Sequence, residues 1–303
     1  MELPVNQIIN GDVLQVLKDL PSESIDCCIT SPPYWGLRDY GVNGQIGLEK
    51  TPEEYVAKMV EVFSQVKRCL KKEGTLWLNL GDSYAGGGRG CDTPKQQSNR
   101  GTNGMPESII PKGLKAKDLV GSPWRVAFAL QADGWYLRQD IIWHKPNPMP
   151  ESVTDRCTKS HEYVFLMAKS QKYYFDNEAI KEPTVTQDTN IRDRETTKLN
   201  NVPGRSKMKG LTNNNYDLRN RRSVWTVTTK PFSEAHFATF PEDLIVPMVK
   251  AGCPKDGIVL DPFMGAGTTA VVARKLGRRW LGIELNPEYI KIANKRMCQE
   301  VLF

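Results

Sequence analysis

The sequence predicts an α/β protein whose central sheet is mixed and mostly parallel. Short apolar runs alternate with segments of helical periodicity, which is typical of strand–helix units. Two of these units carry unusual residues. The apolar run Ile25–Thr30 is followed directly by Ser31-Pro32-Pro33-Tyr34, and residues 257–284 have the pattern strand, glycine turn, helix, strand. Because ligands bind at the carboxyl ends of strands in open α/β sheets, both places are candidate sites.

The first half of the chain contains most of the predicted strands. Thr51-Pro52-Glu53-Glu54 is a clear helix start, because Thr is a good cap and Pro suits the first helical position. Residues 81–121 are rich in Gly, Asn, Lys and Ser, and a loop of that length is usually functional or disordered. The predicted elements are strands 7–10, 25–30, 75–80, 135–143 and 161–168, and helices 13–20, 52–71 and 122–132.

The second half contains the glycine turn and the elements around it. An apolar run at 258–260 ends on Asp261, and Gly265-Ala266-Gly267-Thr268-Thr269 then opens a helix that stops before Gly277. A strand at 279–283 ends on Glu284. The remaining predicted elements are a strand at 223–227, a helix at 242–250 and a last helix that Asn286 caps, with Pro287 at its first position.

The glycine turn predicts a nucleoside cofactor without phosphates. Its glycines allow close approach of the backbone to a ligand, and Glu284 can accept hydrogen bonds from ribose hydroxyls. A dinucleotide fingerprint would need a third glycine where this chain has Ala270. A carboxylate at Asp261 would repel phosphates but can bind an ammonium group. S-adenosyl-L-methionine has an ammonium group, a ribose and an adenine; the alternative is a turn with no ligand.

The segment Ser31 to Tyr34 suits the binding of an exocyclic amino group. The two prolines fix the backbone and remove two N–H donors, so their carbonyl groups can face a ligand. The tyrosine offers a flat surface on which a base can stack. Trp35 is either a further ligand contact or a packed aromatic residue. The alternative for the whole segment is an ordinary proline-rich turn.

Ser-Pro-Pro-Tyr early in the chain and Asp-Pro-Phe-x-Gly-x-Gly-Thr late in it resemble the motifs of the amino-group DNA methyltransferases. More narrowly, the chain resembles their β class, found in restriction–modification systems, in which the catalytic motif precedes the cofactor motif. The resemblance covers nearly the whole chain. It implies a Rossmann-like S-adenosylmethionine-dependent methyltransferase fold with circularly permuted motif order and a small target-recognition insertion.

The resemblance also implies roles for single residues. Ser31 and the Pro32 carbonyl would accept hydrogen bonds from the target amino group, Pro33 would complete the motif, and Tyr34 would stack on the flipped-out base. Asp12 would contact the cofactor adenine, although it is an equally good N-cap for the helix after it. The stretch 236–241 would contact the methionine end of the cofactor or, equally, begin a helix at Pro241. The full set of predicted cofactor-binding residues is Asp12, Phe240, Pro241, Asp261, Phe263, Gly265, Gly267, Thr268 and Glu284.

Residues 176–222 are predicted to be the target-recognition insertion. From 181 to 222 the chain has ten Lys or Arg against five Asp or Glu, so this segment holds most of the net charge of +6. Arg and Asn are residue types that read base edges and grip phosphates, and we expect Arg219, Arg221 and Arg222 to bind DNA. A solvated linker is the alternative, and residues 84–121 could instead close over DNA or share recognition. The insertion would separate a catalytic half, 1–175, from a cofactor-binding half, 223–303.

The predicted reaction is methyl transfer from S-adenosyl-L-methionine to an amino group of a flipped-out base in double-stranded DNA. Methylation of the cytosine ring carbon would need a cysteine nucleophile, and none of the seven cysteines follows a proline, as it does in that other family. Serine in the first motif position accompanies cytosine in the family, so cytosine N4 is expected and adenine N6 is the alternative. A catalytically silent DNA-binding protein and a nicotinamide-dependent oxidoreductase are two competing hypotheses.

Composition agrees with these expectations. The chain is 39% hydrophobic and 25% charged, which is ordinary for a soluble protein, and its pI near 8.8 is compatible with nucleic acid. Three histidines and the cysteine spacing favour neither a metal site nor a disulfide framework. We expect a cytoplasmic protein with no membrane segment, monomeric or homodimeric, with a cognate restriction endonuclease as a potential partner.

Overall fold

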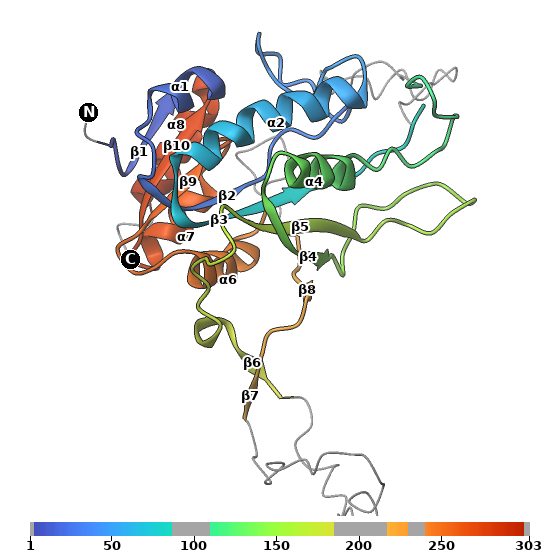
Figure 1. Cartoon of the computed structure of the whole chain (residues 1–303). Helices are drawn as coiled ribbons and strands as arrows, with labels where there is room; N and C mark the ends of the chain where they lie inside the picture. Colours follow the sequence, from blue (N-terminus) through green and yellow to red (C-terminus); the bar gives the residue numbers. More distant parts are fainter. Residues whose placement is uncertain (1–2, 87–109, 185–216, 230–239, 300–303) are drawn as a thin grey trace, which may run out of the picture. The chain divides into compact units, whose positions relative to one another are not determined.

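The computed structural model describes residues 3–86, 110–184, 217–229 and 240–299 (Figure 1). It divides into two compact units, one formed by Met1–Asp176 with Ser223–Phe303 and the other by Asn177–Arg222. Three parts of the predictions lie outside the described residues: the glycine-rich stretch 86–90 beyond residue 86, most of the insertion (185–216), and residues 236–239 of the segment that precedes Phe240.

The larger unit is built on an eight-stranded sheet of order β1-β10-β9-β2-β3-β5-β4-β8. Neighbouring strands are parallel except on the two sides of β5, which runs antiparallel to both β3 and β4. The predicted mixed, mostly parallel sheet is therefore confirmed. The strands are β1 (Gln7–Asn10), β2 (Ile25–Thr30), β3 (Leu70–Leu80), β4 (Tyr136–His144), β5 (His161–Ala168), β8 (Val224–Thr226), β9 (Ile258–Asp261) and β10 (Arg279–Glu284).

Helices cover both faces of this sheet (Figure 1). On one face, α1, α2 and α4 bury their apolar sides in a single core, and on the other α6 packs on β2 and β3 while α7 packs on β9 and β10. No helix in the described ranges combines the length and apolarity needed to cross a bilayer. The helices are α1 (Val13–Asp19), α2 (Pro52–Cys69), α4 (Ser122–Ala132), α6 (Glu242–Gly252), α7 (Thr268–Lys275) and α8 (Pro287–Gln299).

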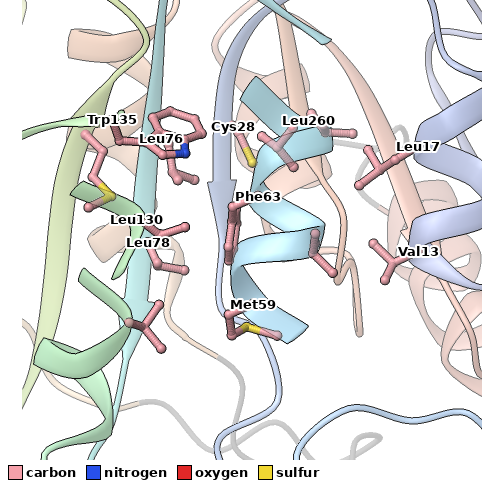
Figure 2. Close-up of a cluster of buried hydrophobic side chains, with 14 of the residues drawn as sticks. Val13, Leu17, Cys28, Met59, Phe63, Leu76, Leu78, Leu130, Trp135 and Leu260 are labelled. Carbon is pink, nitrogen blue, oxygen red and sulfur yellow. The ribbon is translucent and has the colours of Figure 1, made fainter. Parts of the chain in front are cut away.

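The core between α2 and the sheet fixes the strands that carry the site. Met59 and Phe63 of α2 belong to one cluster with Cys28 of β2 and with Leu76 and Leu78 of β3 (Figure 2), and all five side chains are inaccessible to solvent. Burial of each such side chain contributes about 1.5–3 kcal/mol. The centre of the sheet is thus a rigid support for the residues at its edge.

The start of one strand differs from the prediction by several residues. β3 begins at Leu70, immediately after α2, rather than at Thr75. Residues 71–74 are Lys, Lys, Glu and Gly, whose polarity hides the first part of the strand from an analysis of apolar periodicity.

The smaller unit contains a short antiparallel pair, β6 (Glu182–Pro183) and β7 (Leu218–Arg219), and the 3₁₀ turn η1 (Glu178–Ile180). The Glu182 carboxylate accepts from Arg219 Nε at 3.0 Å and from Arg222 Nε at 2.7 Å. These ion pairs join the two ends of the unit.

Candidate active site

The residues that the sequence predicts to be functional lie together at one edge of the sheet. Because β1, β10, β9, β2 and β3 are parallel, their carboxyl ends lie at the same edge. Asp12, Glu284, Asp261 and Ser31 stand at or just after these strand ends. β5 is antiparallel, so its first residues, including Glu162, lie at that edge too.

The turn between β9 and α7 is shaped by its glycines and by Glu284. Gly265 and Gly267 have φ values of 52° and 80°, which glycine adopts without strain. Glu284 accepts from the Gly265 N–H and from the Asn286 N–H, both at 2.8 Å. Burial raises the pKa of Glu284. Each carboxylate oxygen has more than one acceptor site, so Glu284 can hold the turn and still accept from a ribose hydroxyl.

Asp261 lies beneath this turn and has no solvent-exposed surface. It accepts from Thr30 Oγ1 at 2.7 Å, Thr269 Oγ1 at 2.7 Å and the Phe263 N–H at 3.0 Å. Burial raises its pKa to about 6, against the opposing effect of these three hydrogen bonds. The expectation that Asp261 itself binds an ammonium group does not match this geometry, because its oxygens face protein donors. Asp261 instead ties the glycine turn to the end of β2.

Two further residues that were predicted to bind the cofactor make contacts within the protein instead. The Thr268 hydroxyl accepts from Arg296 Nη1 at 2.9 Å, and Thr268 is only 4% exposed. Pro241 is buried and caps α6, so it begins the helix as the alternative predicted. Phe240 and Phe263 are half-buried and remain available to line a ligand site.

Asp12 is the N-cap of α1, with its Oδ1 accepting from the Gln15 N–H at 3.0 Å. The capping alternative is therefore confirmed. The preceding Gly11 N–H donates to the Glu284 carbonyl at 3.1 Å, which keeps Asp12 beside the end of β10. A second role toward the cofactor stays a prediction.

The segment after β2 is held by a network of hydrogen bonds. Ser31 Oγ lies 3.1 Å from the Tyr34 hydroxyl, which donates to Glu162 Oε2 at 2.8 Å. The Tyr34 ring packs against Gly81, where an added Cβ would lie 2.6 Å from Tyr34 Cε2. Trp35 is 5% exposed and its Nε1 donates to a backbone carbonyl, so it is the packed aromatic residue of the two alternatives.

Three residues of this network were not predicted. Asn79 of β3 donates from Nδ2 to Glu162 Oε2 at 2.9 Å and to the Tyr34 hydroxyl at 2.5 Å. Lys145, which follows β4, forms an ion pair with Glu162 and lies 4.2 Å from the centre of the Trp143 ring. Burial acts to raise the pKa of Glu162, but Lys145 and the hydrogen bonds from Lys145, Asn79 and Tyr34 outweigh it and lower the pKa. Each of the three is a polar residue within two residues of one end of a strand, and this position was the available signal in the sequence.

An aromatic pair beside Glu284 was also missed. The rings of Tyr40 and Tyr289 meet edge to face with centroids 6.3 Å apart. Burial, with the nearby Tyr40 hydroxyl and Glu284 carboxylate, raises the pKa of Tyr289 to about 12. Burial also raises the pKa of Tyr40. Both hydroxyls therefore stay neutral next to the predicted ribose acceptor.

The predicted DNA-binding arginines belong to the smaller unit. Arg219 and Arg222 both donate to Glu182, and their side chains are 29% and 64% exposed. Burial lowers the pKa of Arg221. Arg222 is thus the more accessible of the two arginines that pair with Glu182.

Comparison with known proteins identifies the family. A family model described as DNA methylase, of the N6/N4 type, matches residues 25–295. This chain belongs to the N6/N4 DNA methylases. The resemblance inferred from its two motifs is confirmed.

Several relatives of this DNA methylase match it over nearly its whole length. It is 48% identical to the type II methyltransferase M.Cfr9I of Citrobacter freundii over 301 residues, which cover 99% of this chain and 90% of the relative. It is also 48% identical to the type II methyltransferase M.SmaI of Serratia marcescens over 293 residues, covering 97% and 91%.

Solved structures share the fold of this DNA methylase. The cytosine-N4-specific PvuII DNA methyltransferase superposes with a TM-score of 0.65 at 19% identity, covering 97% of this chain and 86% of that one. A putative DNA modification methylase from Thermus thermophilus, complexed with S-adenosyl-L-methionine, gives a TM-score of 0.60 at 24% identity, covering 97% and 95%. The predicted methyltransferase fold is thereby confirmed.

Proposed function

We propose that this DNA methylase transfers a methyl group from S-adenosyl-L-methionine to the exocyclic N4 of cytosine in double-stranded DNA. The observation that carries the proposal is the position of Ser31. It stands at the end of β2, hydrogen-bonded to Tyr34, at the same sheet edge as the glycine turn and Glu284. The methyl acceptor and the methyl donor can therefore meet within one site.

The residues of the cofactor side fit S-adenosyl-L-methionine. Glu284 offers acceptors for the ribose hydroxyls, the glycine turn permits close approach of the backbone, and Tyr40 and Tyr289 supply apolar surface beside Glu284. When bound, the cofactor supplies an electrophilic methyl carbon on a sulfonium. The role of Asp261 is indirect, because it positions the turn.

Ser31 and Pro32 act on the amino group of the base. The amino nitrogen is a poor nucleophile because its lone pair is delocalised into the ring. Acceptors at Ser31 Oγ and the Pro32 carbonyl would bind the amino hydrogens and turn the lone pair toward the methyl carbon. The amino nitrogen would take up the methyl group that the cofactor supplies and would then release one proton to solvent. No covalent link to the protein is needed.

The target base must leave the duplex, because its amino group is not accessible to the site while it is paired and stacked. Tyr34 is half-buried, and its ring packs against Gly81. The remaining surface of the ring is proposed to stack on the base.

The choice of cytosine over adenine rests on Ser31 and on relatives. The superposed PvuII enzyme is cytosine-N4-specific, and two relatives with 48% identity are type II methyltransferases. We propose by analogy that this enzyme also protects sites cut by a cognate restriction endonuclease. Adenine N6 remains the other outcome of the test.

The smaller unit, 177–222, is proposed to recognise the target sequence. Its sequence is basic, and Arg222 is exposed. Arg219, Arg221 and Arg222 are the side chains proposed to contact DNA.

Methylation of the cytosine ring carbon is not favoured. Such a reaction needs a thiolate, and burial raises the pKa of Cys27 and Cys28 well above the usual value and that of Cys253 to about 12. These buried thiols stay protonated and have no contact with the Ser31 segment in the described hydrogen bonds.

The test is to incubate the protein with S-adenosyl-L-methionine and mixed-sequence duplex DNA, digest the DNA and identify modified nucleosides by mass spectrometry. N4-methylcytosine supports the proposal, and N6-methyladenine overturns the base assignment. DNA binding without any modified base would instead support a catalytically silent binding protein.

A further inference from the structure

Ser31 has to accept hydrogen bonds, yet a serine hydroxyl can also donate one. If its hydrogen pointed at the target base, it would repel an amino group and attract a carbonyl oxygen. The residues around Ser31 therefore decide which kind of base the site can bind.

The hydrogen bonds behind Ser31 have one consistent direction. Glu162 carries a carboxylate that can only accept, and the ion pair with Lys145 keeps it charged. The Tyr34 hydroxyl at 2.8 Å must then donate its single hydrogen to Glu162. Its oxygen is left as an acceptor, toward which Asn79 Nδ2 already donates.

The hydrogen bond from Tyr34 to Glu162 also determines the donor in the hydrogen bond between Tyr34 and Ser31. The two hydroxyl oxygens are 3.1 Å apart, and Tyr34 has no second hydrogen to give. Ser31 must therefore donate to Tyr34, and this commits the only hydroxyl hydrogen of Ser31. Asn79 Nδ2 also donates to Ser31 Oγ at 3.3 Å, which again requires Ser31 to act as an acceptor. The remaining lone pair of Ser31 Oγ is left for an amino hydrogen of the base.

We infer that Glu162, paired with Lys145, is a positioning residue that fixes the direction of the chain Ser31–Tyr34–Glu162 and so makes the site specific for an amino group. The inference rests on the proposed methyl transfer and deepens it. A base with a carbonyl oxygen at the same position, such as thymine, would find no hydroxyl hydrogen at Ser31 to accept.

The first test is Glu162→Gln. A glutamine amide can donate to the Tyr34 oxygen, which lets Tyr34 donate to Ser31 and turns the Ser31 hydrogen toward the base. We expect the single-turnover methyl-transfer rate to fall by roughly 10- to 100-fold, with the Kd for S-adenosyl-L-methionine and for duplex DNA within about twofold of wild type.

Glu151→Gln is the matched control. Glu151 lies in the connection between β4 and β5, before the strand that carries Glu162; its side chain is 29% exposed and pairs with Arg156 at 2.6 Å. It has no hydrogen bond to Ser31, Tyr34 or Glu162 among the described contacts. We expect this variant to transfer methyl groups at the wild-type rate.

The second test, Lys145→Met, distinguishes an effect of the hydrogen-bond direction from a general structural effect of a substitution. Loss of Lys145 removes the main charge that lowers the Glu162 pKa, so Glu162 becomes protonated at a higher pH and can then donate. The variant should lose activity as pH falls, at a pH where wild type is still active. Lys159 and His161 also face Glu162, but they are present in both proteins and cancel in the comparison.

Each outcome has one meaning. A wild-type rate in Glu162→Gln, or superimposable pH profiles for Lys145→Met and wild type, would overturn the inference while the proposed function stands. Failure of the wild-type protein to methylate DNA would overturn the proposed function itself. If Glu162→Gln no longer binds S-adenosyl-L-methionine, the pH profile of Lys145→Met decides.

Discussion

Asp261 shows how a buried charge can serve the site without touching a ligand. Its three donors come from β2, the turn and α7, so the carboxylate joins three segments. Its pKa of about 6 lies above the ordinary value because burial disfavours the charged form more than the donors favour it.

This raised pKa predicts a pH-dependent stability. The folded protein holds a proton on Asp261 up to about pH 6, and the unfolded chain releases it near pH 4, so the free energy of unfolding falls as pH rises between these values. Asp261→Asn carries no charge and should lack this contribution. Glu284, whose pKa is also raised, contributes equally to both proteins.

Denaturant unfolding at pH 4.5 and 7 measures the effect. We expect the variant to gain about 1–3 kcal/mol relative to wild type on going from the lower to the higher pH. A difference between the two proteins that stays constant with pH would contradict the assigned pKa.

Gly81→Ala tests the packing of Tyr34. The new methyl group would lie 2.6 Å from the ring, which must shift and loosen the hydrogen bonds of its hydroxyl. We expect kcat to fall by roughly 10-fold or more, with unchanged affinity for S-adenosyl-L-methionine as the internal control. Unchanged kcat would mean that the position of the ring is not critical.

The start of α1 has an observed role, the cap at Asp12, and a predicted role toward the cofactor, and one pair of variants can separate them. Asp12→Ala removes the cap and should cost about 1 kcal/mol of unfolding free energy, whereas Asp12→Asn keeps a good cap. If Asp12 also contacts the cofactor adenine, Asp12→Asn will retain stability and weaken cofactor binding. Calorimetric titration measures the cofactor affinity of both variants, and denaturant unfolding measures their stability. A wild-type cofactor affinity in Asp12→Asn would mean that Asp12 serves only as the cap.

The contact of α6 with β3 depends on Gly252. A Cβ there would lie 2.3 Å from Trp77 Nε1 and 2.9 Å from Thr75 Oγ1. Gly252→Ala should therefore destabilise the protein by about 1–3 kcal/mol, measured by denaturant unfolding. Wild-type stability would show that the helix end can move away from the sheet at little cost.

The strands and helices were largely predictable because each has a local signal. β2 and β9 are apolar runs that end at a polar residue, and α2 begins with a strong cap. The start of β3 was missed because residues 71–74 are polar. Leu70 belongs to the strand through its pairing with Ile25 of β2, which apolar periodicity does not report.

The site was predictable only in part, because some of its contacts form only when the strands pair in the sheet. The turn glycines and Ser31 belong to contiguous motifs. Asn79 and Glu162 become neighbours only since β5 runs antiparallel to β3, and Lys145 joins them through β4. No local pattern in the sequence could reveal this pairing, or the burial that prevents Asp261 from reaching a ligand.

The larger unit is expected to carry out methyl transfer, and the smaller unit is expected to recognise the DNA sequence. Arg222→Ala should weaken binding to duplex DNA and reduce the slope of log K against log salt by about one if this side chain contacts a phosphate. Affinity for S-adenosyl-L-methionine should not change. An unaltered salt slope, measured by fluorescence anisotropy, would remove Arg222 from the DNA interface.

Ser31 is proposed to bind the amino group that receives the methyl group. The most direct test compares wild type with Ser31→Ala in single-turnover reactions on the DNA that the wild type modifies, with N4-methylcytosine quantified by mass spectrometry. We expect the rate for the variant to fall roughly 100-fold or more, at unchanged affinity for S-adenosyl-L-methionine. N4-methylcytosine formed by Ser31→Ala at the wild-type rate would show that Ser31 does not bind the amino group during methyl transfer.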